Sequence, residues 1–238
     1  MLSKIKSMSL EGLTGYLVEI QSDVSGGLPS FEIVGLPDVR VKEAKERVRT
    51  AIKNSGIEFP SRKIIVNLAP ADIRKEGTFF DLPIAIGILI ALGEISKIKI
   101  KNFESTIFLG ELSLDGNINR VNGVLPMCIE ARELGIKRVI LPKENAIEAS
   151  IIKGLDIVPV ENLLDVIDYV TGNLEIPNYI SNETHNFENL SNYEFDFSDV
   201  KGQENAKRAL EIAATRFSQL FTLSEHLGLV KVYYQKEL

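Results

Sequence analysis

The sequence contains few of the side chains that crosslink a chain or bind a soft metal ion. Among its 238 residues there is one cysteine, Cys128, and there are two histidines, His185 and His226. A single thiol excludes an intramolecular disulfide and suits a reducing cytoplasm. Because zinc sites need clustered cysteine and histidine ligands, we expect no metal site here. Cys128 stands in an apolar helical stretch, so we expect its side chain to be buried.

Long hydrophobic runs are also missing. The longest, Leu82–Leu92, is shorter than the roughly 20 residues that a bilayer-spanning helix needs, and it fits a fully buried helix. The opening Met1–Lys6 lacks the apolar segment of a secretory signal. We therefore expect a cytoplasmic protein that makes no contact with a membrane.

Positive charge is in the minority. The chain has 27 basic and 33 acidic residues, for a net charge of -6. This balance excludes a protein whose whole surface binds nucleic acid, although a local basic face is compatible with it. Apolar residues make up 45% of the sequence, enough to bury one full core.

Residues 1–36 are predicted to form strands. Tyr16–Ile20 and Phe31–Val34 flank a turn-rich segment at 25–29, so we expect the two to pair as an antiparallel hairpin. The pair Gly26-Gly27 is interpreted as the bend of that hairpin. A phosphate cradle is the less favoured interpretation, because no strand–loop–helix pattern with a lysine follows.

A basic amphipathic helix is predicted over Val39–Asn54. Asp38 is placed to cap its N-terminus, and Gly56 to end it in a left-handed conformation. Its apolar residues recur at helical spacing and form the predicted buried stripe: Val41, Ala44, Val48, Ala51 and Ile52. Its candidate DNA-binding residues are Arg40, Lys42, Lys45, Arg47, Arg49 and Lys53. Two interpretations stay open: a solvated face with ion pairs to Glu43 and Glu46, or a surface that faces DNA.

Strands and helices alternate along the next part of the chain, which indicates an α/β (α+β) fold. Asp81 is the predicted N-cap of the apolar helix, and Asp115-Gly116 the predicted tight turn of a hairpin. The predicted strands are 63–68, 106–112, 117–121, 139–142 and 157–160, and the predicted helices are 81–92, 125–134, 145–152 and 163–170.

Two segments resemble the proteolytic domain of Lon, a fold shared with domain 2 of ribosomal protein S5. Arg74–Pro83 corresponds to the run that carries the nucleophilic serine of Lon at the mouth of a helix. Gly110–Gly116, followed by Val121–Val124 and Gly135–Pro142, corresponds to the hairpin, helix and strand that carry its catalytic lysine. The resemblance implies a Lon-like, S5 domain 2-like fold for residues 1–172.

The resemblance does not extend to peptidase chemistry. A serine–lysine dyad needs a hydroxyl and a neutral amine within hydrogen-bond reach. The serine position matches Phe79, and the lysine position matches Met127, or Leu125 if the register slips. Lys75 and Lys137 do not stand at the matching helix position. We therefore expect these apolar replacements to fill the former cleft and the peptidase activity to be absent.

The composition changes again after residue 172. Asparagine and acidic residues dominate 173–197, which we interpret as an interdomain linker. Residues 198–214 then read as the start of an AAA+ ATPase module, with Asp-Val-Lys-Gly-Gln-Glu-Asn-Ala-Lys-Arg-Ala-Leu-Glu-Ile-Ala-Ala over 199–214.

Together the two parts resemble the bacterial magnesium-chelatase-like AAA+ proteins of the ComM type. Gly35–Asp38 and Asn67–Asp72 are also characteristic of that family. The resemblance implies a homo-hexameric motor that uses ATP and Mg²⁺ and acts on DNA; the best-understood member migrates DNA branches during natural transformation. It does not imply metallation of a porphyrin. Val200, Gly202 and Gln203 match the segment that lines the adenine pocket in related ATPases.

The phosphate loop of such an ATPase, Gly-x-x-x-x-Gly-Lys-Ser/Thr, occurs nowhere in the 238 residues. We therefore expect this chain to bind no cofactor and to have no ATPase activity. Codons chosen for 225–232 and read one register away give Gly-Thr-Pro-Gly-Ser-Gly-Lys-Ser, so a frameshift is the preferred explanation of 215–238. A genuine amphipathic tail is the alternative.

Three functional hypotheses follow. The first is the N-terminal fragment of an AAA+ DNA motor, truncated before its phosphate loop. The second is a stand-alone module with a protease-like fold that binds DNA or a protein. The third is a peptidase of unfamiliar chemistry, which would require casein digestion that disappears on Ser113→Ala or Ser61→Ala.

Overall fold

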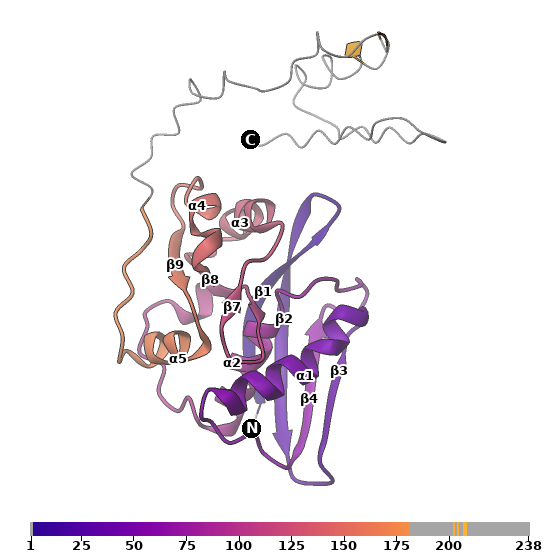
Figure 1. The fold of residues 1–238 in the computed structure, drawn as a ribbon, viewed down its shortest axis with the longest axis vertical. Coiled ribbons are helices and arrows are strands. Elements are labelled where there is room, and N and C mark those ends of the chain that lie inside the picture. The colour runs from indigo at the N-terminus through magenta and orange to yellow at the C-terminus, as the bar shows by residue number, and fades with distance from the viewer. Residues whose placement is uncertain (1, 181–201, 203, 205–206, 209–238) are drawn as a thin grey trace. The chain divides into compact units, whose positions relative to one another are not determined.

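A mixed seven-stranded sheet organises the first part of the chain (Figure 1). Its strands are β1 (Leu2–Glu11), β2 (Thr14–Ser25), β3 (Ser30–Val34), β4 (Lys63–Ala69), β5 (Thr106–Phe108), β8 (Arg138–Pro142) and β9 (Asp156–Val160). The strand order is β3-β4-β2-β1-β5-β8-β9. Strand β2 is antiparallel to both its neighbours, and the other neighbouring pairs are parallel. The mixture confirms the predicted α/β (α+β) class.

The computed structural model describes residues 2–180, 202, 204 and 207–208. The chain divides into two compact units, Met1–Asn182 and Glu183–Leu238. The helices of the first unit are α1 (Val39–Asn54), α2 (Asp81–Leu92), α3 (Val124–Glu133), α4 (Ala146–Ala149) and α5 (Leu163–Thr171), with short 3₁₀ turns at Phe103–Ser105 and Lys143–Asn145.

The hairpin at the start of the fold joins β1 to β2. The two strands pair from Leu2↔Asp23 to Glu11↔Thr14, and Gly12 in the turn between them has a φ of 62°. The expected hairpin between Tyr16–Ile20 and Phe31–Val34 is wrong, because β4 lies between β2 and β3 and pairs with both. Alternating hydrophobicity identifies a strand, but it does not specify the partner of that strand.

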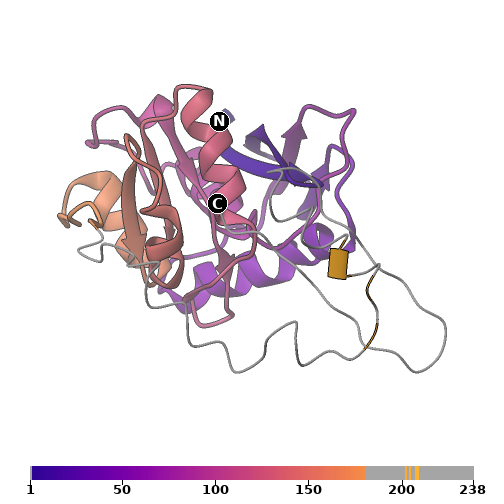
Figure 2. The ribbon, with the colours of Figure 1, turned by 90° about the horizontal axis from the view of Figure 1, so that it is seen from above.

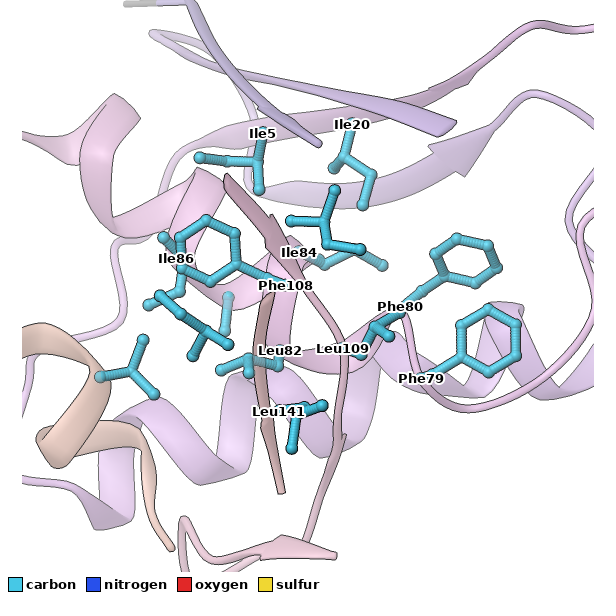
Figure 3. Packing of buried hydrophobic residues seen from close by; sticks show 14 of the residues in the cluster. Ile5, Ile20, Phe79, Phe80, Leu82, Ile84, Ile86, Phe108, Leu109 and Leu141 are labelled. Atoms are coloured by element: carbon cyan, nitrogen blue, oxygen red, sulfur yellow. The ribbon is translucent and has the colours of Figure 1, made fainter. Parts of the chain in front are cut away.

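Helix α2 is the centre of the core (Figure 3). Apart from Asp81 in its first turn it is apolar on all sides, and it contacts β1 and β2 as well as α1. Helix α1 has the predicted bounds: the Asp38 side chain accepts a hydrogen bond from Val41 N, and Gly56 has a φ of 80°. All five residues of the predicted stripe are buried, so the amphipathic pattern placed this helix correctly.

Helices cover both faces of β2 (Figure 2). Gly87 of α2 lies so close to Ser22 that an added Cβ would come within 2.7 Å of its Oγ. A Cβ added at Gly15 would likewise come within 2.8 Å of the Cβ of Glu130, in α3. Ser22 and Gly15 have opposite parity along one strand, so α2 and α3 pack on opposite faces of it.

Two local predictions need correction. Phe80, not Asp81, is the N-cap of α2, and Asp81 is the first residue inside the helix. The predicted strand 106–112 is divided: Thr106–Phe108 joins the large sheet as β5. Only β6 (Glu111–Leu112) turns back at Asp115-Gly116 to pair with β7 (Ile118–Asn119).

Shortly before residue 180 the chain lies beside β9, the last strand of the sheet. Tyr179 N donates to the Ile157 carbonyl at 2.7 Å, and Asn178 Nδ2 donates to Asp156 Oδ1 at 3.0 Å. The side chains of Ile176 and Tyr179 pack against the core. These contacts tie residues 176–179 to the first compact unit, although the sequence assigned them to the linker.

Candidate functional site

The position that matches the Lon serine is filled by an aromatic pair. Phe79 is 8% exposed, and its ring centroid lies 4.7 Å from that of the fully buried Phe80. The Phe79 carbonyl accepts a hydrogen bond from Gly110 N at 3.1 Å. Gly77, with a φ of 104°, lies against the Phe79 ring, and a Cβ there would come within 2.4 Å of it. The ring therefore occupies the space beside this loop.

The position that matches the Lon lysine is closed as well. Met127 is fully buried, and Leu125 is half-buried. The backbone N–H of Leu125 donates to Glu148 Oε1 at 3.0 Å, so a carboxylate from α4 lies at the N-terminal end of α3. Anions are stabilised at helix N-termini, and this contact satisfies one of the free N–H groups there.

The segment before α3 is held by a buried amide. Asn145 accepts a hydrogen bond from Val121 N at 3.0 Å and donates to the Val121 carbonyl at 2.8 Å. Its Nδ2 also lies 3.3 Å from Glu148 Oε2. Neither Asn145 nor Glu148 was recognisable from the sequence, because the backbone groups that they bind, at Val121 and Leu125, are 24 and 23 residues away.

The two lysines considered for catalysis lie in different settings. Lys75 is fully buried, and its Nζ donates to the Ile73 carbonyl at 2.6 Å. Burial lowers the pKa of Lys75 from its ordinary value, while Asp72 raises it. Lys137 is exposed. Ser113, considered for residual peptidase chemistry, donates to Asn119 Oδ1 at 3.0 Å, and Ser61 is exposed.

A buried ion pair joins the basic helix α1 to helix α2. Arg47 Nε lies 2.6 Å from Asp81 Oδ2, and Arg47 Nη2 lies 3.0 Å from Asp81 Oδ1. Leu112 N donates to the same carboxylate at 3.2 Å, so α1, α2 and β6 meet there. Burial raises the pKa of Asp81 to about 6, although Arg47 acts in the opposite direction. Asp81 in turn raises the pKa of Arg47.

The six candidate DNA-binding residues of α1 fall into two groups. Arg47 and Arg49 are engaged within the domain: Arg47 binds Asp81, and Arg49 lies 5.4 Å from the centre of the Phe59 ring. Both also have weak contacts to glutamates of α1, at 3.8 and 3.9 Å. The remaining four are available at the surface: Arg40, Lys42 and Lys53 are exposed and Lys45 is half-buried.

Arg47 therefore departs from the expected DNA-facing set. Its guanidinium is directed into the domain, and its side chain is only 20% exposed. The sequence could not separate Arg47 from its neighbours, because the distinguishing partner, Asp81, lies in another helix. Within 2–180, no ion pair involves the four available cations.

The adenine-pocket residues belong to the second unit. Val200 and Gln203 lie outside the described residues, as do His185, His226 and the whole of 215–238. Gly202 is exposed and has a φ of 75°. The described residues Glu204, Lys207 and Arg208 are helical, with Lys207 Nζ 3.6 Å from Glu204 Oε1.

Comparison with known proteins agrees with the fold described above. The family described as "Subunit ChlI of Mg-chelatase" matches residues 20–145, which is more than half of the chain. The chain belongs to this magnesium-chelatase ChlI-like family. Competence protein ComM of Haemophilus influenzae is 40% identical over 216 residues, covering 90% of this chain and 41% of that protein. The uncharacterized protein YifB of Escherichia coli is 38% identical over 215 residues, covering 90% and 40%.

Similarity to a protease is more limited. Lon protease 2 of Bacillus subtilis is 32% identical over 135 residues, covering 56% of this ChlI-like chain and 23% of the protease. This is consistent with the Lon-like fold predicted from Arg74–Pro83 and Gly110–Pro142. The chain spans about two fifths of the length of the ComM and YifB proteins it matches. In the described residues, no helix has the length and apolarity needed to cross a membrane.

Proposed function

We propose that the first unit is a catalytically silent, Lon-like accessory domain of a cytoplasmic AAA+ protein that acts on DNA. The observation that carries the proposal is the closure of the protease frame. Phe79 matches the nucleophile position by sequence, and Met127, or Leu125 if the register slips, matches the base; Phe79 and Met127 are both buried. Neither side chain can attack a carbonyl or take a proton at neutral pH. Instead, the Lon-like fold holds α1 rigidly in place.

The DNA part of the proposal rests on α1 and on the relatives. Arg40, Lys42, Lys45 and Lys53 lie on a helix whose buried side is fixed by the core and by the Arg47–Asp81 pair. Lysine and arginine side chains held on a rigid element bind phosphates without reading base sequence. The similarity to a competence protein, ComM, and the resemblance to DNA motors noted from the sequence are the grounds for proposing a DNA substrate.

ATP and Mg²⁺ do not fit the residues of this chain. Backbone N–H groups and a lysine of a phosphate loop would have to hold the β- and γ-phosphates, and the 238 residues contain no such pattern. We therefore propose that this 238-residue chain by itself does not hydrolyse ATP. Release of inorganic phosphate, measured with and without DNA, tests this separately from DNA binding.

The DNA role is tested with a fluorescently labelled four-way DNA junction and the 238-residue chain. Anisotropy is followed over a range of salt concentrations. The slope of log K against log salt becomes shallower by about 0.9 for each phosphate that the protein no longer neutralises. The triple variant Arg40→Ala, Lys45→Ala, Lys53→Ala is expected to reduce the slope by about 2 to 3. Lys97→Ala and Lys101→Ala, two exposed lysines outside α1, serve as the matched control.

An unchanged slope in the triple variant would remove α1 as the DNA contact. Absence of salt-dependent binding by the unmodified chain would remove the DNA proposal for this unit altogether. Casein digestion by the same preparation, abolished by Ser113→Ala, would contradict the claim that the frame is catalytically silent.

A further inference from the structure

Two apolar side chains are exposed where β3 leads into α1. Leu36 is 53% exposed and Val39 is 68% exposed. Together with Pro37, Asp38, Lys42 and Arg74 they line a shallow hollow of about 250 Å³. Pockets for small molecules usually measure roughly 300–1,000 Å³. A hollow of this size suits one inserted side chain better than a larger ligand.

The backbone of Leu36 is held in an unusual conformation. Its φ is 57°, in the left-handed region that residues other than glycine rarely adopt. The Leu36 carbonyl accepts a hydrogen bond from Lys75 N at 3.1 Å, and Asp38 N donates to the Lys75 carbonyl at 2.9 Å. On the other side, a Cβ on Gly35 would come within 2.3 Å of the Leu68 carbonyl oxygen.

A glycine would take the conformation of Leu36 without strain. The chain instead carries a large apolar side chain there and leaves half of it in water. Strained residues that display a side chain are typical of functional surfaces. The Leu36 side chain contributes little to the core, so its exposure indicates a contact with another molecule.

Two of the residues that line the hollow are basic, Lys42 and Arg74, and one, Asp38, is acidic. Lys42 is exposed, and within 2–180 it takes part in no ion pair. Arg74 is 68% exposed and has a surface contact to Glu76 at 3.3 Å, which is too solvated to hold it firmly. The Asp38 carboxylate accepts from Val41 N. A ligand with carboxylates therefore meets two available cations.

The lining favours a peptide over nucleic acid. Unpaired bases bind by stacking on aromatic side chains, and none lines this hollow. Leucine, proline and valine gain affinity by removing another apolar side chain from water. We propose that the hollow docks an acidic peptide segment of a partner protein. One apolar side chain of the peptide inserts beside Leu36 and Val39, and carboxylates on either side of it contact Lys42 and Arg74.

The proposal is tested with a fluorescein-labelled peptide, Ser-Asp-Glu-Phe-Asp-Glu-Ser, and anisotropy at low salt with the 238-residue chain. Leu36→Gly removes the side chain while suiting the backbone, so the variant is expected to fold normally and to bind at least tenfold more weakly. Lys42→Glu is expected to weaken binding to a similar degree. Leu28→Gly, at a leucine that is 87% exposed elsewhere, and Lys97→Glu are the matched controls.

Saturable binding that depends on the phenylalanine of the peptide and on Leu36 supports the proposal. It is overturned if the peptide does not bind, or if Leu36→Gly binds it as well as the unmodified chain does. It is also overturned if Leu36→Gly weakens the binding of a single-stranded oligonucleotide as much as that of the peptide. The α1 triple variant leaves Leu36, Lys42 and Arg74 in place, so failure of the DNA proposal would be seen independently.

Discussion

Replacing Arg47 by methionine should destabilise the first unit strongly. Methionine keeps most of the apolar stem of arginine but removes the guanidinium, so Asp81 keeps its burial and loses its counter-charge. The Asp81 side chain has no exposed surface, and besides Arg47 the carboxylate accepts a hydrogen bond from Leu112 N at 3.2 Å. Removing one partner of a buried pair costs about 3–5 kcal/mol. That is a large part of the roughly 5–15 kcal/mol that stabilises an ordinary domain.

The double variant Arg47→Met, Asp81→Asn isolates the interaction between the two charges. Asparagine retains an oxygen that can accept from Leu112 N, but it carries no charge that needs a partner. We expect the double variant to lose only about 1–2 kcal/mol, less than Arg47→Met alone. The coupling energy of the cycle should therefore be about 2 kcal/mol or more.

The cost should also depend on pH. The pKa of Asp81 is raised to about 6 in the folded protein, from 3.8 in an unfolded chain, so the folded state binds its proton more readily. Stability from this group is therefore fully present below pH 4 and is lost as the pH rises through 6. A shift of this size corresponds to about 3 kcal/mol. Without Arg47 the pKa rises further, so Arg47→Met should cost much less at pH 5 than at pH 8.

Urea unfolding followed by far-ultraviolet circular dichroism, at pH 5 and pH 8, measures all these quantities. Asp81→Asn should lack the pH dependence assigned to Asp81 and serves as the reference. A loss below about 1 kcal/mol for Arg47→Met at pH 8 would refute the reasoning, because an unpaired buried carboxylate cannot be that inexpensive. A loss that is equal at both pH values would show that the ionisation of Asp81 is not involved.

Three further outcomes follow from the packing. Cys128 is fully buried, and burial raises its pKa to about 12. A thiol reagent at pH 8 should therefore modify Cys128 only under denaturing conditions. Modification of the native chain would contradict its placement in the core. Gly87→Ala should lose about 1–3 kcal/mol in urea unfolding because the new Cβ meets Ser22 Oγ. Adding Ser22→Ala should recover most of that loss, and no recovery would mean that another contact is responsible. Glu148→Gln should destabilise the unit by roughly 0.5–1 kcal/mol by removing charge from the N-terminus of α3, measured against Glu144→Gln at an exposed neighbour.

Local signals in the sequence were enough for α1. Its caps, its ending glycine and its buried stripe all depend on residues within one helix. The same kind of signal failed for Asp81, where an N-cap prediction competes with an ion pair to another helix. Similarly, Phe31–Val34 was recognisable as a strand, but its position beside β4 depends on residues that come later in the chain.

The candidate site divides in the same way. The sequence singled out Phe79 and Met127 because each lies near a motif that resembles Lon, although the register around Met127 also allows Leu125. Leu36 could not, because leucine at a positive φ is the opposite of what local propensity predicts. Its conformation is imposed by Lys75 and by the close approach of Leu68, which only the folded chain brings together.

The strand order has a consequence for how the chain folds during synthesis. β1 and β2, the earliest strands described, are central to the sheet, and their hairpin needs no residue beyond Ser25. The sheet then grows outward on both sides: β4 adds to β2, and β5, β8 and β9 add in turn beyond β1. Only β3 must wait, because its partner β4 is made later. Most strands thus meet a finished edge as they leave the ribosome, which limits the time that an unpaired edge is exposed to aggregation.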